Sequence, residues 1–122
     1  MPGKVKLLVV DDEESLRMIL KNELAEHGFD VTEADSGEAA LRAMETSTPD
    51  LVILDVRMPG MDGLEVLKTI RQNNLAKKVI MLTGVDELKI ARESLQFGAN
   101  DFMTKPFQFK NMYACIERVM KE

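Results

Sequence analysis

Short apolar runs alternate with longer amphipathic segments along the whole chain of 122 residues. Runs rich in branched residues are typical of buried strands in a parallel sheet, and the longer segments are typical of helices that cover such a sheet. The predicted strands span residues 7–10, 31–34, 51–54, 79–82 and 102–104. Five strand and helix pairs joined by right-handed crossovers predict an α/β fold with a doubly wound, five-stranded parallel sheet.

The predicted helices each carry one apolar stripe, with residues spaced three and four apart. The stripes are Leu16, Ile19, Leu20 and Leu24; Ala40, Leu41 and Met44; Leu64, Leu67 and Ile70; Leu88, Ala91 and Leu95; and Met112, Ile116, Val119 and Met120. The fourth stripe is the weakest, so we expect that helix to be mobile. Gly28 and Gly98 stand where helices should end, and Ser36 and Asp86 stand where helices should begin. The expected strand order is 2-1-3-4-5, the flavodoxin-like arrangement.

Composition limits the chain to a few classes of protein. A length of 122 residues fits one domain and leaves no room in this sequence for a second folded output domain. Sixteen basic and twenty-one acidic residues give a net charge of -5, so we expect neither direct nucleic-acid binding nor attraction to an anionic membrane. A single cysteine, Cys115, excludes an internal disulfide, and no apolar run of signal-peptide length precedes Lys4. We therefore expect a cytoplasmic location.

Acidic residues follow the first and third predicted strands. Asp11 and Asp12 end the first strand and Asp55 ends the third, and a sheet of this order binds its ligands at the carboxyl edge between those two strands. Carboxylates brought this close repel one another unless a cation intervenes, and clustered oxygen ligands suit Mg²⁺. The alternative is that Asp11 and Asp12 only cap the following helix, with Glu13 and Glu14. From these acidic residues alone, a capping role explains the sequence at least as well as a metal site does.

The ends of the other two strands favour a chemical site. The fourth strand finishes with Thr83 and Gly84, and the fifth finishes with Lys105 and Pro106. A hydroxyl donor, a small residue that leaves open space, an ammonium group and a carboxylate nucleophile are the parts that an acyl-phosphate site needs. Each residue alone has an ordinary explanation, and their joint placement on one edge points to phosphoryl chemistry.

Three segments carry a family resemblance. Residues 7–12 read LLVVDD, residues 51–63 read LVILDVRMPGMDG, and residues 100–107 read NDFMTKPF. Together they resemble the signatures of the response-regulator receiver domain of two-component signalling and phosphorelays, as in the chemotaxis receivers. The similarity runs from about Lys6 to Lys121, so residues 1–122 are expected to form one receiver domain.

The resemblance implies roles for individual residues. Asp55 would accept a phosphoryl group from a histidine kinase or a histidine phosphotransfer protein. Asp12 and Asp55 would bind Mg²⁺ directly, Asp11 partly through water, and Arg57 through its backbone carbonyl. Apart from its own phosphorylation and dephosphorylation, the chain would catalyse no reaction.

The resemblance also implies a phosphate-binding group and a switch. Thr83 and Lys105 would bind phosphoryl oxygens, beside the space that Gly84 leaves. The bond from Lys105 to Pro106 is cis in relatives, but most such bonds are trans, so the sequence leaves its isomer open. Phosphorylation would draw the Thr83 hydroxyl inward, and Phe102 would turn into the space behind it. An ordinary core role for Phe102 remains the alternative.

The expected output face consists of the fourth helix, the fifth strand and the fifth helix. It would bind an output domain or a partner protein, and a homodimer through the same face is a second option. The sequence leaves open whether the chain stands alone or belongs to a larger regulator. Arg57 and Val85 occupy positions that vary among receivers and influence phosphoryl lifetime, so the lifetime is unassigned.

Three other functions compete with the receiver interpretation. A haloacid-dehalogenase-type phosphohydrolase would place a second acid two residues after the nucleophile, where this chain has Arg57. An interaction module that never takes phosphate predicts a missing site residue, and none is missing. A nucleotide or flavin binder needs a glycine-rich loop after the first strand, where residues 11–14 are all acidic.

Overall fold

The computed structural model describes residues 4–122, which contain one five-stranded parallel sheet. Its strand order is β2-β1-β3-β4-β5, so the predicted fold class and order are confirmed. The strands are β1 (Lys6–Val10), β2 (Asp30–Ala34), β3 (Leu51–Asp55), β4 (Lys78–Gly84) and β5 (Asp101–Lys105). Each lies within two residues of its predicted bounds.

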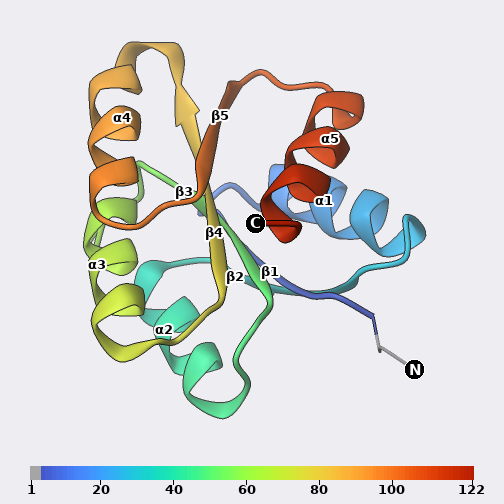
Figure 1. The fold of residues 1–122 in the computed structure, drawn as a ribbon, viewed down its shortest axis with the longest axis horizontal. Helices are drawn as coiled ribbons and strands as arrows, with labels where there is room; N and C mark the ends of the chain where they lie inside the picture. The colour runs from blue at the N-terminus through green and yellow to red at the C-terminus, as the bar shows by residue number, and fades with distance from the viewer. Residues whose placement is uncertain (1–3) are drawn as a thin grey trace.

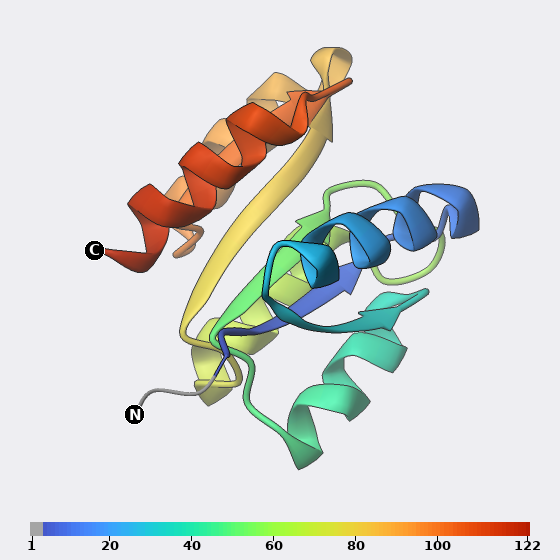
Figure 2. The ribbon, with the colours of Figure 1, turned by 90° about the vertical axis from the view of Figure 1, so that its right-hand side faces the viewer.

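Helices cover both faces of the sheet. They are α1 (Glu14–Glu26), α2 (Gly37–Thr46), α3 (Gly63–Asn73), α4 (Leu88–Gln96) and α5 (Phe109–Met120), with a short 3-10 turn, η1 (Val85–Glu87), before α4. Helices α2, α3 and α4 lie on one face, and α1 and α5 lie on the other (Figure 1). Figure 2 shows α1 and α5 in front of the sheet. Within residues 4–122, none of the helices is both long and apolar enough to cross a bilayer.

The core consists of two apolar layers that share the central strands. Val52 and Leu54 belong to the layer beneath α2 and α3, while Leu51 and Ile53 belong to the layer beneath α1 and α5. Side chains of a strand alternate between faces, so a strand covered on both sides is apolar throughout. Every residue of β3 is buried, including Asp55 at its end. This strand therefore fixes Asp55 at the carboxyl edge of a rigid sheet.

Most predicted helix boundaries are confirmed. The Ser36 hydroxyl accepts a hydrogen bond of 3.1 Å from the backbone N–H of Ala39 at the start of α2. Gly28 and Gly98 follow α1 and α4 with positive φ angles of 102° and 104°, which favour glycine. The prediction that Asp86 begins a helix as its cap is wrong, because Asp86 lies inside η1 and α4 starts two residues later.

Two residues predicted for apolar stripes lie at the surface. Ile19 in α1 is 53% exposed and Leu95 in α4 is 42% exposed. The fully buried residues of α1 are Leu20 and Leu24 alone, because the helix meets the sheet along a narrow row. In α4 the buried residues are Ala91 and Ser94. Ser94 can be buried because its hydroxyl donates to the Ala91 carbonyl, so the serine replaces an apolar residue that the pattern required.

Candidate functional site

Three carboxylates converge at the carboxyl edge of the sheet. One oxygen from each of Asp11, Asp12 and Asp55 lies within 4.8 Å of the others. Strands β1 and β3 pair side by side, with Val10 opposite Leu54, so the residues that follow each strand meet. Asp11 and Asp55 are buried and Asp12 is exposed. The predicted convergence of the three side chains is confirmed.

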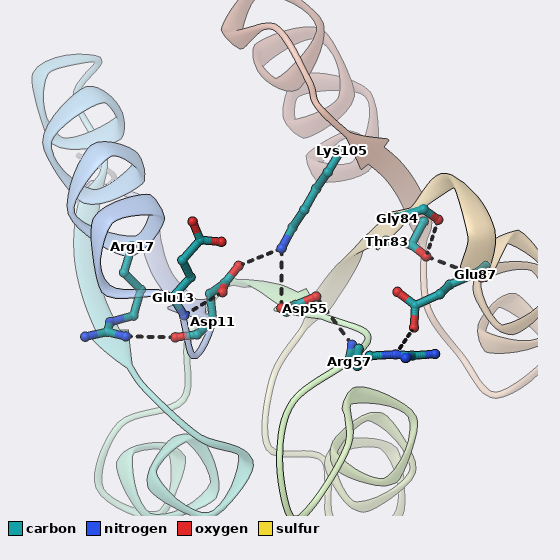
Figure 3. Close-up of polar contacts among 9 residues, drawn as sticks. All are labelled: Asp11, Glu13, Arg17, Asp55, Arg57, Thr83, Gly84, Glu87 and Lys105. Atoms are coloured by element: carbon teal, nitrogen blue, oxygen red, sulfur yellow. Dashed lines mark hydrogen bonds and ion pairs between the residues drawn. The ribbon is translucent and has the colours of Figure 1, made fainter.

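Lys105 reaches this cluster from the end of β5. Its Nζ lies 3.1 Å from Oδ2 of Asp11 and 3.3 Å from Oδ2 of Asp55 (Figure 3). Strand β4 lies between β3 and β5, and the long lysine side chain spans that distance. The peptide bond from Lys105 to Pro106, whose isomer the sequence left open, is cis. The ammonium group therefore bridges two buried carboxylates.

Burial and like charge set the protonation of the cluster. Burial first, and then the charge of Asp11, raise the pKa of Asp55 to about 6, although Lys105 acts in the opposite direction. Burial alone would lower the pKa of Lys105, but the charges of Asp55 and Asp11 outweigh it and raise that pKa. One ammonium group faces three carboxylates, so negative charge is in excess. Such an all-oxygen cluster suits a hard divalent cation such as Mg²⁺.

Asp11 has a second role at the start of α1. Its Oδ1 accepts a hydrogen bond of 2.9 Å from the backbone N–H of Glu13, while its Oδ2 binds Lys105. The alternative that Asp11 caps α1 is wrong, because the N-cap of α1 is Glu13 and carries no side-chain cap; the Asp11 bond closes the turn just before the helix instead. Arg17 Nη1 donates to the backbone carbonyl of Asp11 at 2.9 Å, and Arg17 Nε binds Glu33 at 3.0 Å. Sequence analysis missed Arg17, because nothing in its spacing indicated a partner on β2.

The loop after β3 folds back against Asp55. The backbone N–H of Arg57 donates to Oδ1 of Asp55 at 3.4 Å, and the N–H of Gly63 donates to the carbonyl of Val56 at 2.9 Å. A Cβ atom on Gly63 would lie 2.2 Å from the backbone oxygen of Asp55. Only glycine permits this approach. Sequence analysis quoted Gly63 within a motif but did not predict this close contact.

Thr83 points away from Asp55. The threonine is fully buried, and its hydroxyl donates toward two backbone carbonyls, that of Gly84 at 3.2 Å and that of Glu87 at 3.3 Å. Phe102, on β5, is half-buried and packs against the core layer beneath α2, α3 and α4. The structure therefore brings Asp11, Asp12, Asp55 and Lys105 together and leaves the hydroxyl of Thr83 and the ring of Phe102 outside that group.

An open cleft lies above the cluster. The residues that line it are Asp12, Asp55, Arg57, Met58, Pro59, Gly84, Glu87 and Lys105. Glu87 is the charged member that sequence analysis missed. Its carboxylate forms an ion pair with Arg57, with Oε2 lying 2.5 Å from Nε. The cleft thus offers one bound ammonium, one guanidinium and an acidic floor, which can hold a cation and an anionic group together.

The chain has sequence relatives among bacterial regulators. The profile of the response regulator receiver domain family matches residues 7–117. The chain is 44% identical over 116 residues to the alkaline phosphatase synthesis transcriptional regulatory protein PhoP of Bacillus subtilis, covering 95% of this chain and 48% of PhoP. It is 35% identical over 116 residues to the chemotaxis protein CheY of the same organism, covering 94% of this chain and 97% of CheY. It spans about half the length of PhoP and nearly all of CheY.

Solved structures agree with the sequence relatives. The chain superimposes on the receiver domain of the Francisella response regulator 1452 with a TM-score of 0.88 at 32% identity, covering 97% of this chain and 98% of that one. It superimposes on NtrX from Brucella abortus with a TM-score of 0.91 at 31% identity, covering 97% of this chain but 27% of NtrX. The chain therefore belongs to the response regulator receiver domain family of two-component signalling.

Proposed function

We propose that the chain, as one receiver unit over residues 6–121, accepts a phosphoryl group on Asp55 from a phosphohistidine donor. The observation that carries this proposal is the position of Asp55. It is a buried carboxylate at the end of the central strand, it opens into a cleft, and it is bridged by Lys105 to a second buried carboxylate. Asp55 would be the one side chain of the protein that forms a covalent bond to phosphorus.

The proposed transfer needs an ionised Asp55. A carboxylate oxygen donates an electron pair to phosphorus, and the bond from phosphorus to the donor imidazole nitrogen breaks, with its electron pair remaining on nitrogen. Such transfers depend on positioning and charge neutralisation more than on covalent help from the protein. The pKa of Asp55, raised by burial and by Asp11 to about 6, still leaves the carboxylate mostly ionised at neutral pH.

The acidic cluster supports a role for Mg²⁺. The carboxylates of Asp12 and Asp55, the carboxylate of Asp11 partly through water, and the backbone carbonyl of Arg57 would hold the ion. When bound, Mg²⁺ would neutralise the charge that phosphoryl oxygens bring to a site where carboxylates are already in excess.

Lys105, Thr83 and Gly84 are the proposed phosphate-binding residues. The Lys105 ammonium lies 3.3 Å from Asp55 and can exchange one carboxylate contact for a phosphoryl oxygen. Gly84 lines the cleft without a side chain of its own. Thr83 must rotate, because its hydroxyl now donates to backbone carbonyls of the following turn. That rotation is the proposed switch, and Phe102 would move into the space that Thr83 leaves.

The proposed output face consists of α4, β5 and α5. A shallow hollow there includes Phe102, Phe107 and Asn111, so a movement of Phe102 would change its shape. We propose that a cytoplasmic output domain or partner protein, or a second copy of the chain, binds this face. Substituting Phe102 with alanine should leave phosphorylation intact and weaken that binding. Unchanged affinity for the partner would remove Phe102 from the mechanism.

Intact-mass measurement tests the phosphoacceptor. The native protein should gain one phosphoryl group from acetyl phosphate in the presence of Mg²⁺, and should gain none when the ion is chelated. Asp55→Asn should gain none under either condition. Asp30→Asn is the matched control, because Asp30 is exposed at the opposite end of the sheet and should leave labelling unchanged. An adduct on Asp55→Asn would refute the assignment.

A further inference from the structure

Glu87 makes two contacts that converge on the phosphoacceptor cleft. Its carboxylate binds the Arg57 guanidinium at 2.5 Å, and its backbone carbonyl accepts the Thr83 hydroxyl at 3.3 Å (Figure 3). The Glu87 side chain is only 10% exposed, whereas that of Arg57 is 74% exposed. Glu87, which lies in the turn after β4, therefore connects this turn to Arg57 in the loop after β3 and to the Thr83 hydroxyl near the end of β4.

A phosphoryl group on Asp55 would act on both contacts. The Thr83 hydroxyl has a single hydrogen, so it cannot donate to a phosphoryl oxygen while it donates to the backbone carbonyl of Gly84 or of Glu87. Glu87 and Asp55 line the same cleft, so added negative charge on Asp55 repels the Glu87 carboxylate and attracts the Arg57 guanidinium. Both effects separate Glu87 from Arg57.

We infer that Glu87 is a positioning residue that holds the turn after β4 in its unphosphorylated arrangement, through Arg57 and Thr83. This inference rests on the proposed function of Asp55. The phosphoryl group releases the turn by competing with Glu87 for Arg57, and the freed turn lets the Thr83 hydroxyl face the phosphoryl oxygens. Glu87 therefore opposes activation, and its removal should favour the activated arrangement.

The first test measures the affinity for beryllofluoride, a phosphoryl mimic, in the presence of Mg²⁺. Glu87→Gln keeps the size of the side chain and removes its charge, so it should bind beryllofluoride about two- to fivefold more tightly, the range expected for loss of a partly exposed ion pair. Glu117→Gln is the matched control, because Glu117 pairs with Lys121 on α5 and should leave the affinity unchanged. The double variant Arg57→Glu with Glu87→Arg restores an ion pair between the two positions. Its affinity for beryllofluoride should therefore lie closer to the native value than that of Glu87→Gln does.

The second test separates positioning from a general charge effect. In Glu87→Gln with Mg²⁺ and no beryllofluoride, the methyl and amide NMR signals of Thr83 should shift toward their positions in the beryllofluoride-bound native protein. Tighter binding without that shift would mean that Glu87 only repels anions, and would overturn the inference. Native-like affinity in Glu87→Gln would also overturn it while leaving the role of Asp55 intact. Failure of the native protein to bind beryllofluoride or take up phosphate would overturn the inference and the proposed function together.

Discussion

Gly63 begins α3 directly behind Asp55, and alanine at this position tests how closely the loop after β3 is packed. A Cβ atom there would lie 2.2 Å from the backbone oxygen of Asp55 and 2.8 Å from the Cα of Val56. Both neighbours are backbone atoms, so rotation of a side chain cannot relieve the overlap. The two segments must separate by about 0.8 Å to reach 3.0 Å, the shortest contact that a real Cβ tolerates.

The sign of the effect depends on two opposing contributions. Overpacking of this severity costs about 3 kcal/mol of unfolding free energy, the upper end of the usual range. Alanine favours a helix over glycine by about 1 kcal/mol, which offsets part of that cost. Gly63→Ala should therefore lower the unfolding free energy by about 2 kcal/mol and the Tm by roughly 8 °C. Helix propensity alone predicts the opposite sign.

Urea denaturation measures the stability, and labelling by acetyl phosphate measures the site. Because the displaced atoms belong to the backbone of Asp55, labelling of Gly63→Ala should slow by about tenfold. Gly28→Ala is the control: Gly28 has a φ of 102° and open space around a Cβ, so it should cost roughly 1 kcal/mol through backbone strain and leave labelling at the native rate. A Gly63→Ala protein as stable as the native one would refute the packing argument.

Other properties of the chain can be tested in the same assays. Burial and a neighbouring carboxylate raise the pKa of Asp55 from 3.8 to about 6, so its ionisation removes stability as the pH rises through that interval. At pH 8 without metal, Asp55→Asn should be more stable than the native protein by about 3 kcal/mol, with the difference vanishing near pH 4 and shrinking in Mg²⁺. A less stable variant at pH 8 would contradict this. Burial also raises the pKa of Cys115 to about 11. A disulfide reagent at pH 8 should therefore modify this thiol roughly 100-fold more slowly in the folded protein than in the urea-unfolded protein. Equal rates would show that the folded protein exposes a thiolate. Arg71 donates to the carbonyl of Gly98 at 2.9 Å and to the side chain of Asn100 at 2.9 Å. Arg71→Met should therefore lower the unfolding free energy in urea titrations by about 2 kcal/mol and leave phosphoryl labelling unchanged. A variant as stable as the native protein would refute this structural role of Arg71.

The fold could be predicted because its signal is periodic. Strands covered on both faces require continuous apolar runs, and such runs stand out against the longer spacing of the helices. The pattern failed where burial depends on how a helix meets the sheet. Ile19 and Leu95 have the spacing of buried residues and lie at the surface. The burial of Ser94 was missed as well, because apolar spacing cannot show that a serine hydroxyl donates to a carbonyl of its own helix.

The convergence of charged groups at one edge of the sheet could be predicted for a different reason. The order of strands in a doubly wound sheet decides which strand ends meet, and Asp11, Asp55 and Lys105 are each within one residue of such an end. Contacts made from turns and helices carry no comparable signal. The pair of Arg57 and Glu87 joins a loop to a 3-10 turn thirty residues further along the chain, and only the folded chain brings them together.

The distribution of packing suggests why charge at Asp55 should be transmitted toward α4. Asp55 ends a strand that is buried along its whole length, so the backbone beneath it cannot yield to added charge. The turn after β4 is held by hydrogen bonds and one ion pair, and the helix that follows buries only Ala91 and Ser94 completely. Small buried side chains give little apolar stabilisation, so displacing this segment costs less than displacing β3. Repulsion generated by a phosphoryl group on Asp55 would therefore be relieved by movement of the turn and α4, on the side of the molecule where the proposed output face lies.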